Sequence, residues 1–114
     1  MAGLVTRSVD LPLAGGGLHQ RKGLVMNERE LQAFISVADH GRMDLAARAL
    51  GYSQPAVSYQ IKCLEQAIGT RLFVRNSGGT TITRSGALML PSVRAVLMLM
   101  QAIKQAAVET VPSV

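Results

Sequence analysis

The sequence predicts a mainly α fold, in which three helices and a two-stranded β-hairpin precede one long C-terminal helix. Two observations support this fold class. Apolar residues recur at amphipathic-helix spacing in four segments, each bounded by a capping residue or by glycine. Between the third and fourth segments, residues 72–75 alternate in polarity and residues 76–79 contain consecutive glycines, which is typical of a hairpin.

Composition limits the class of protein. The chain of 114 residues has room for one small domain with accessory segments. Hydrophobic residues make up 48% of it and aromatic residues only 4%, so we expect a mainly aliphatic core. The net charge of +5 is consistent with an anionic partner, nucleic acid ahead of a membrane surface, although solubility alone is the alternative. The single cysteine, Cys63, cannot form an internal disulfide or a zinc cage, and it fits a reducing cytoplasm.

Residues 1–25 show no hydrophobic periodicity that lasts a full helical turn, and they include the run Gly15–Gly17. We predict that this segment is a disordered N-terminal extension. It lacks a continuous apolar stretch long enough for a secretory signal. We expect ordered structure to begin at Asn27.

The first helix is predicted from Asn27 to about His40. Asn27 and Glu30 have the spacing of a capping box, with Asn in place of the usual Ser or Thr. Gly41 follows as a stop signal. The buried face is predicted to carry Leu31, Phe34, Ile35 and Ala38.

Two more helices follow closely. A short one is predicted over residues 43–50, where small alanines allow a neighbouring helix to approach. Ser53 is a suitable N-cap for the third helix, and Pro55 lies in its first turn, where the missing N–H costs little. Gly69 is expected to end this helix after Ile68. Two helices joined by a tight turn behind a supporting helix make a helix-turn-helix.

The third helix has two chemically distinct faces. One forms an apolar stripe at spacings of four, three and four residues: Val57, Ile61, Leu64 and Ile68. The other gathers polar and hydrogen-bonding side chains with one cation: Gln54, Ser58, Tyr59 and Lys62. Such a helix suits the major groove of DNA, where base edges are read by hydrogen bonds.

The predicted hairpin has strands at residues 72–75 and 80–82, joined by a turn at Asn76–Gly79. As a wing beside the third helix, it could bring Arg75 to the DNA backbone or minor groove. Arg71 and Arg84 flank it, and no acidic residue occurs between Glu65 and Glu109. The alternative is a plain hairpin that only covers the edge of the core.

Thr83 is expected to cap a long helix that runs toward Thr110. A membrane span is the competing reading, but a proline and three polar or charged residues interrupt the apolar segment. A helix this apolar would expose a large patch unless a second chain covers it, so we predict homodimerisation. The alternative is that the helix folds back on its own domain. A heptad-like seam is predicted at Met89, Val93, Val96, Met100 and Ile103.

Several motifs, in this order and spacing, resemble the DNA-binding domain and linker helix of LysR-type transcriptional regulators. They are Leu31-Gln32-Ala33-Phe34, Val37-Ala38, residues 46–50, residues 53–75 and Thr83-Arg84-Ser85-Gly86. The similarity extends from Asn27 to about Thr110, roughly three quarters of the chain. It implies a winged helix-turn-helix over residues 26–82, a linker and dimerisation helix over 83–110 and a tail at 111–114. It also implies binding to inverted-repeat promoter sites as a homodimer.

The resemblance implies roles for individual residues. Base contacts are expected from Gln54, Pro55, Ser58 and Tyr59. Phosphate contacts are expected from Ser53, Gln60, Lys62, Arg75 and Arg42. Tyr59 stands where many members have Arg, which changes the expected operator. Arg42 and Met43 replace the usual Ser and Phe, so a capping contribution of about 1 kcal/mol is expected to be missing at the second helix.

Family members continue into a two-lobed domain that binds a small-molecule inducer, so we expect no small-molecule site in these residues. We also expect no cofactor, no metal site and no enzymatic activity. Neither His19 nor His40 has a cysteine or a paired carboxylate at catalytic spacing, and no phosphate-binding glycine loop follows a strand. A second functional class stays open: an interaction module whose long helix captures full-length relatives as inactive heterodimers.

Overall fold

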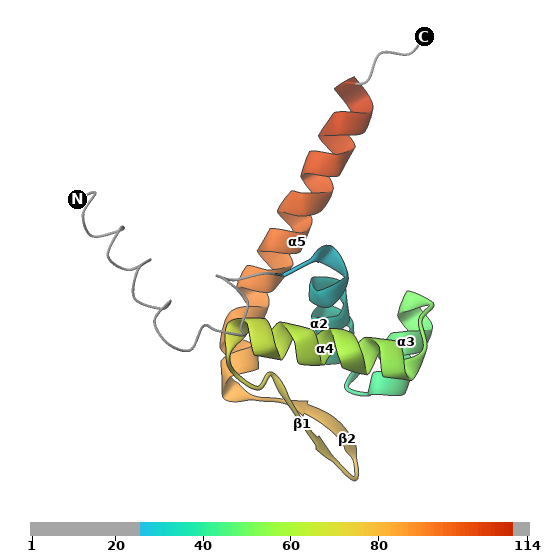
Figure 1. The fold of residues 1–114 in the computed structure, drawn as a ribbon, viewed down its shortest axis with the longest axis vertical. Helices are drawn as coiled ribbons and strands as arrows, with labels where there is room; N and C mark the ends of the chain where they lie inside the picture. Colours follow the sequence, from blue (N-terminus) through green and yellow to red (C-terminus); the bar gives the residue numbers. More distant parts are fainter. Residues whose placement is uncertain (1–25, 111–114) are drawn as a thin grey trace, which may run out of the picture.

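The computed structural model describes residues 26–110, so the expectations for residues 1–25 and 111–114 lie outside the described residues. The elements follow the predicted order, and the mainly α fold class is confirmed. The helical core, the hairpin below it and the long helix that extends away from it are seen in Figure 1. The elements are α2 (Glu28–His40), α3 (Met43–Leu50), α4 (Gln54–Ile68), β1 (Phe73–Asn76), β2 (Gly79–Ile82) and α5 (Arg84–Thr110).

Capping side chains begin three of the helices as predicted. Asn27, Ser53 and Thr83 each accept a hydrogen bond from the backbone N–H three residues later, at 2.9, 3.2 and 3.0 Å. Glycines in the left-handed conformation end α2 and α4: Gly41 has φ 73° and Gly69 has φ 85°. The helix boundaries therefore follow from local backbone chemistry.

The core lies between α2, α3 and α4. Val57, Ile61 and Leu64 form the inward stripe of α4 as predicted, and all three are buried. One aromatic pair supplements the aliphatic packing: the Phe34 and Phe73 rings meet edge to face with centroids 5.5 Å apart. Because Phe73 belongs to β1, this contact joins the hairpin to the helical core.

The hairpin is tighter than predicted, since its turn has two residues rather than four. Asn76 pairs with Gly79 as the last rung of the antiparallel ladder. The Asn76 side chain accepts a hydrogen bond from the Gly78 N–H and donates one to Thr81 Oγ1, both at 3.0 Å. These bonds satisfy polar groups beside the turn and extend the strands by one residue on each side.

The hairpin is also fixed to the turn between α2 and α3. The Thr80 N–H donates to the Gly41 carbonyl oxygen at 3.1 Å. Gly79 has φ 133°, and a Cβ there would lie 2.9 Å from that same carbonyl oxygen. Only glycine allows this close approach, so the orientation of the hairpin depends on Gly79.

One face of α5 packs on its own domain, which differs from the predicted seam. Met89, Val93 and Met100 face the core of this chain, and Val93 is only 7% exposed. They continue the helix face that covers α2, where burial within the chain carries no cost of association. The alternative reading, in which the helix folds back, therefore holds for this face.

Two ion pairs hold α5 against α2. Arg94 Nη2 lies 2.5 Å from Asp39 Oδ1, and Lys104 Nζ lies 3.1 Å from Glu28 Oε1. By length and composition alone, α5 could cross a membrane, as no other helix in residues 26–110 could. Two of its three cations, Arg94 and Lys104, are however paired with carboxylates of a neighbouring helix, which fits a water-exposed surface.

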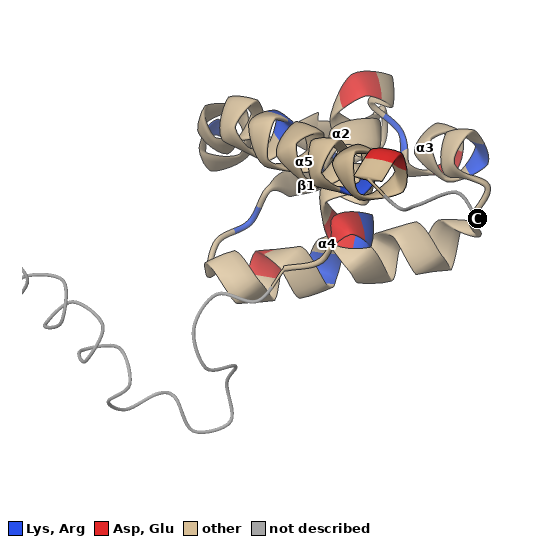
Figure 2. Cartoon of the chain, turned by 90° about the horizontal axis from the view of Figure 1, so that it is seen from above, with Lys and Arg blue, Asp and Glu red and all other residues tan. Residues whose placement is uncertain are grey.

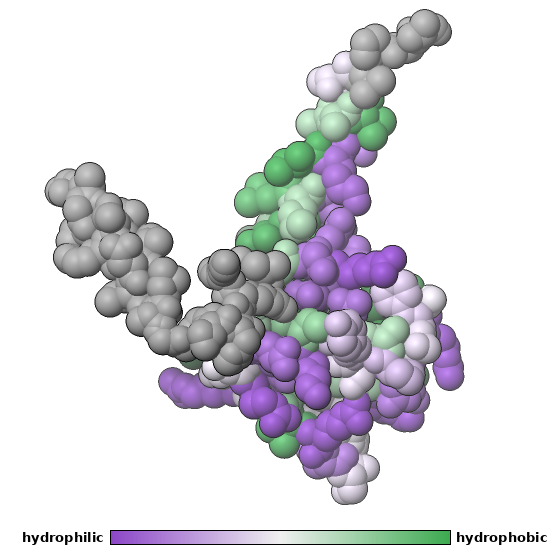
Figure 3. All heavy atoms as spheres, viewed as in Figure 1, coloured by the Kyte–Doolittle hydropathy of each residue, from purple (hydrophilic) through white to green (hydrophobic). Residues whose placement is uncertain are grey.

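A second apolar face of α5 points to solvent. Figure 3 shows hydrophobic side chains gathered along one side of this helix. The residues are spaced by eight, three and four positions and therefore share one side. We call them the α5 apolar stripe: Leu88, Val96, Leu99 and Ile103, which are 68%, 39%, 64% and 69% exposed. The stripe keeps Val96 and Ile103 of the predicted seam and replaces its other members.

Candidate nucleic-acid interface

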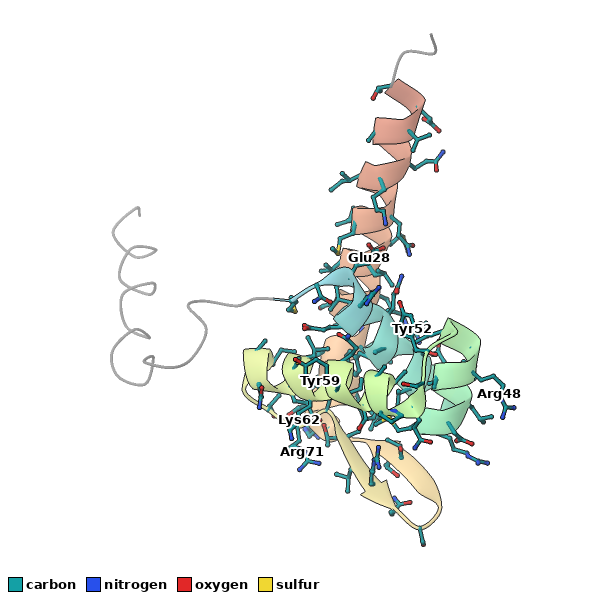
Figure 4. All side chains as sticks on the ribbon, turned by 45° about the vertical axis from the view of Figure 1, so that its right-hand side comes forward. Glu28, Arg48, Tyr52, Tyr59, Lys62 and Arg71 are labelled. Atoms are coloured by element: carbon teal, nitrogen blue, oxygen red, sulfur yellow. The ribbon has the colours of Figure 1, made fainter. Side chains whose placement is uncertain are left out.

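The outward face of α4 is open to solvent. Ser53, Gln54 and Pro55 at its start are exposed, as are Tyr59 and Lys62 further along. Figure 4 shows Tyr59 and Lys62 projecting from α4, with Arg71 below them. The surface over α4 and the hairpin is mainly hydrophilic in Figure 3. The polar face of α4 is therefore exposed while its apolar face is buried, as the sequence predicted for a helix that enters the major groove of DNA.

The hairpin lies along one flank of this face. Arg75 Nη2 donates a hydrogen bond to Ser58 Oγ at 3.3 Å, and Ser58 is half-buried beneath it. A groove of about 310 Å³ runs between α4 and β1, and its lining includes Lys62, Arg71 and Arg75. Three cations, from α4, from β1 and from the segment between them, therefore border one groove, as a surface that follows a phosphate backbone requires.

Glu65 organises this groove, a role that the sequence analysis did not assign. Its Oε2 atom accepts hydrogen bonds from the backbone N–H groups of Leu72 and Phe73, at 2.7 and 3.3 Å. Its Oε1 atom lies 3.6 Å from Arg71 Nε. The carboxylate thus fixes the start of β1 against α4. The one signal for it is its position as the last acidic residue before the long acid-free stretch.

Arg42 lies at the N-cap position of α3 but makes no cap hydrogen bond there. Its guanidinium instead forms a fork with Asp44, with Nε–Oδ1 at 3.0 Å and Nη2–Oδ2 at 2.8 Å. The hydrogen bonds from Arg42 lower the pKa of the Asp44 carboxyl below its usual value, so Asp44 is ionised at neutral pH. The sequence predicted that the cap hydrogen bond would be missing, but it did not predict the ion pair between Arg42 and Asp44.

Gln60 is the one predicted contact residue that lies apart from the others. It is two positions from Ser58, about 200° around the helix, and it is half-buried on the flank away from the hairpin. The other predicted residues lie on the α4 face or around the groove, so the structure brings most of the predicted set together.

Charge is distributed unevenly over the molecule. Figure 2 shows one basic and one acidic stretch on α4 and basic colour on the segment that joins α4 to β1, whereas acidic colour is prominent on α2. Across residues 26–110, no group of three or more His, Cys, Asp or Glu side chains is placed to hold a metal ion. What the surface offers is hydrogen-bond donors and positive charge beside a protruding helix.

Comparison with known proteins places this arrangement in a family. The family described as "Bacterial regulatory helix-turn-helix protein, lysR family" matches residues 29–87, slightly more than half of the chain. The HTH-type transcriptional regulator CzcR of Bacillus thuringiensis is 42% identical over 81 residues, covering 71% of this chain and 27% of that protein. TfdS of Cupriavidus pinatubonensis is 42% identical over 74 residues, covering 65% and 25%. The chain spans about a quarter of the length of these relatives.

Solved structures agree with this match. The DNA-binding domain of CbnR, crystallised as a complex with DNA, superposes with a TM-score of 0.68 at 34% identity, covering 72% of this chain and 94% of that chain. A C206 mutant of Corynebacterium glutamicum OxyR superposes with a TM-score of 0.74 at 25% identity, covering 81% and 30%. The predicted winged helix-turn-helix followed by a long helix is therefore confirmed. From the family match and the shared fold, we conclude that this chain belongs to the LysR family of bacterial helix-turn-helix regulatory proteins.

Proposed function

We propose that this chain binds double-stranded DNA in a sequence-specific manner, with α4 in the major groove and the hairpin as a wing on the adjacent backbone. The observation that carries the proposal is the open polar face of α4 beside the Arg75 guanidinium, which contacts Ser58. A duplex has two features that fit this surface: base edges in the groove and phosphates along its rim. We infer a role in transcription regulation from the family.

Each side chain receives a role within this proposal. Groups near the start and middle of α4, all exposed except the half-buried Ser58, are assigned to base edges: Gln54, Pro55, Ser58 and Tyr59. Groups around this face are assigned to phosphates: Ser53, Lys62, Arg75, Arg42 and, on the far flank, Gln60. Bidentate pairing of the Gln54 amide with adenine is the contact with the greatest discriminating power.

We propose further that two chains associate through α5 and bind inverted-repeat promoter sites. The α5 apolar stripe supports this, because an exposed apolar surface is stabilised when a second chain covers it and removes it from water. A two-fold symmetric pair presents its two α4 helices to two half-sites of opposite orientation. The site as proposed needs neither cofactor nor metal, performs no catalysis and acts in the cytoplasm rather than at a membrane.

Selection of bound duplexes from random DNA tests the function. The expected result is an enriched inverted repeat, bound by a species with twice the mass of the chain in sedimentation. Affinity measured over a salt series should then fall with a log–log slope of about −4 to −5, for four to six phosphate contacts per dimer. Failure to enrich any sequence, with a flat salt dependence, would contradict the proposal.

The same apolar stripe supports a second candidate function, capture of longer relatives as heterodimers with weak DNA affinity of their own. Tyr59, in place of a family arginine, favours it because one cation is missing from the α4 face. The salt series separates the two candidates, since an interaction module would show little salt dependence in DNA binding.

A further inference from the structure

A small hollow marks the corner where α3, α4 and the wing meet. Its volume is about 180 Å³. Gln54 at the start of α4 lines one side, Arg75 of the wing lines another, and Arg42 and Asp44 at the start of α3 line the third. Two guanidinium groups from different elements therefore border one hollow that opens beside the face assigned to DNA.

The two arginines differ in whether a neighbouring carboxylate neutralises their positive charge. Arg42 is held by the Asp44 carboxylate through two hydrogen bonds, and the two side chains are 56% and 39% exposed. This pair is neutral overall. Arg75 donates to the uncharged hydroxyl of Ser58 and keeps its full positive charge. Arg42 still offers N–H groups, because a guanidinium has five and the fork uses two.

A neutral pair and a free cation act differently on DNA. Attraction to any duplex depends on the number of phosphates that the protein neutralises, so a neutral pair adds little to it. Oriented N–H donors act only at hydrogen-bond distance, after the protein is seated. A pair of this kind at the interface edge therefore contributes more to the seated complex than to non-specific binding.

Building on the DNA-binding function proposed above, we propose that Asp44 is a specificity-determining residue. It neutralises and orients Arg42 at the corner hollow, which receives one backbone phosphate of the bound duplex between Arg42 and Arg75. Asp44 acts through Arg42 and is a positioning residue. Asp44 lowers the electrostatic attraction to every duplex, but the Arg42 donors that it orients recover part of this loss only in the seated operator complex, so the difference in affinity between the operator and other DNA widens.

The test compares Asp44→Asn with Glu28→Gln, which also removes one negative charge from an ion pair. Glu28 pairs with Lys104 and lies on the side of α5, away from α4 and the wing (Figure 4). The probes are the operator selected from random DNA and a duplex of equal length without it. Asp44→Asn should raise affinity for the second duplex about 2- to 10-fold and steepen its salt slope by about 0.9 per protomer.

Affinity for the operator should rise less in Asp44→Asn, so the specificity ratio falls. Glu28→Gln should leave both affinities near their original values, and Asp44→Glu should keep the ratio of the unaltered chain. The double variant Arg42→Ala with Asp44→Asn should lose the gain in non-specific affinity, because the released cation is gone. Circular dichroism of each variant confirms that the helices are retained.

Two results would overturn the inference while leaving DNA binding intact. One is equal non-specific affinity in Asp44→Asn and Glu28→Gln. The other is a proportional loss of both affinities in Asp44→Asn, which indicates a structural role. If the unaltered chain binds neither duplex, the proposed function fails, and this inference fails with it.

Discussion

Arg75 and Ser58 connect the wing to α4, because the Arg75 guanidinium donates a hydrogen bond to the Ser58 hydroxyl across 3.3 Å. The two residues are 17 positions apart in the chain, so the contact exists only in the folded domain. It joins a side chain assigned to the DNA backbone with one assigned to base edges. The contact therefore helps to fix the position of the wing beside the polar face of α4.

Arg75→Ala should weaken binding to all duplexes alike, because phosphate contacts carry no direct sequence information. The salt slope should become shallower by about 0.9 per protomer for each lost phosphate contact. The measurement is affinity for operator and unrelated duplexes over a salt series. Lys104→Ala removes the same charge from α5 and serves as the matched control. A loss confined to the operator would contradict the backbone role.

Gln54→Ala should reduce operator affinity by roughly 1–3 kcal/mol, because a bidentate amide–base contact is lost from an exposed side chain at the start of α4. Discrimination should relax at one base pair of each half-site, which a repeated selection from random DNA would reveal. Gln66→Ala, on the same helix beyond Lys62, is the control. An unchanged base preference at every position would remove Gln54 from the set of base contacts.

Glu65→Ala should lower the free energy of unfolding by about 1–3 kcal/mol, because it leaves the partly buried N–H groups of Leu72 and Phe73 without their acceptor. Denaturant unfolding measures this difference. Gln66→Ala again serves as the control, since Gln66 is exposed. If Glu65→Ala unfolds at the same denaturant concentration as the control, the carboxylate does not hold the wing.

Asp44 should give a pH-dependent contribution to stability, because its pKa is lowered by the hydrogen bonds from Arg42. A carboxyl with a folded-state pKa below the unfolded value of about 3.9 stabilises the fold above that pH. This stabilisation is lost as the pH falls through the folded-state pKa. The difference in unfolding free energy between the unaltered chain and Asp44→Asn should therefore shrink toward zero in acid. A difference that grows below pH 4 would have the wrong sign.

Local chemistry made much of this fold predictable. Asn27, Ser53 and Thr83 mark helix starts by side-chain capping, and glycines mark helix ends, so these boundaries could be read without tertiary information. Residues on the polar face of α4 could be found for the same reason, since helical spacing fixes which side chains share a face.

Specific side-chain contacts were not predictable in this way. The Glu65 carboxylate accepts hydrogen bonds from backbone amides seven and eight residues away. In the sequence alone, this residue cannot be distinguished from any other polar side chain. The Arg42–Asp44 fork depends on rotamers that no spacing rule specifies. The heptad pattern in α5 did not distinguish residues that cover their own domain from those that face outward, because both sets are apolar and interleaved.

The division of α5 into two apolar faces predicts opposite results for two similar substitutions. Ile103→Asp places a charge on the exposed stripe, where the side chain is 69% exposed, so the chain should fold normally but sediment as a monomer. Val93→Asp places a charge at a position that is 7% exposed in the single chain, so it should lower the free energy of unfolding by several kcal/mol.

Sedimentation velocity and thermal unfolding of both variants separate the two effects. Gln101→Asp, which adds the same charge at an exposed polar position of α5, is the control and should change neither property. Because a dimer binds two half-sites at once, Ile103→Asp should also lose most of its operator affinity while a single half-site is bound as before. An unchanged mass for Ile103→Asp would place the interface elsewhere on the chain, since a buried charge on a real seam cannot be tolerated without a partner.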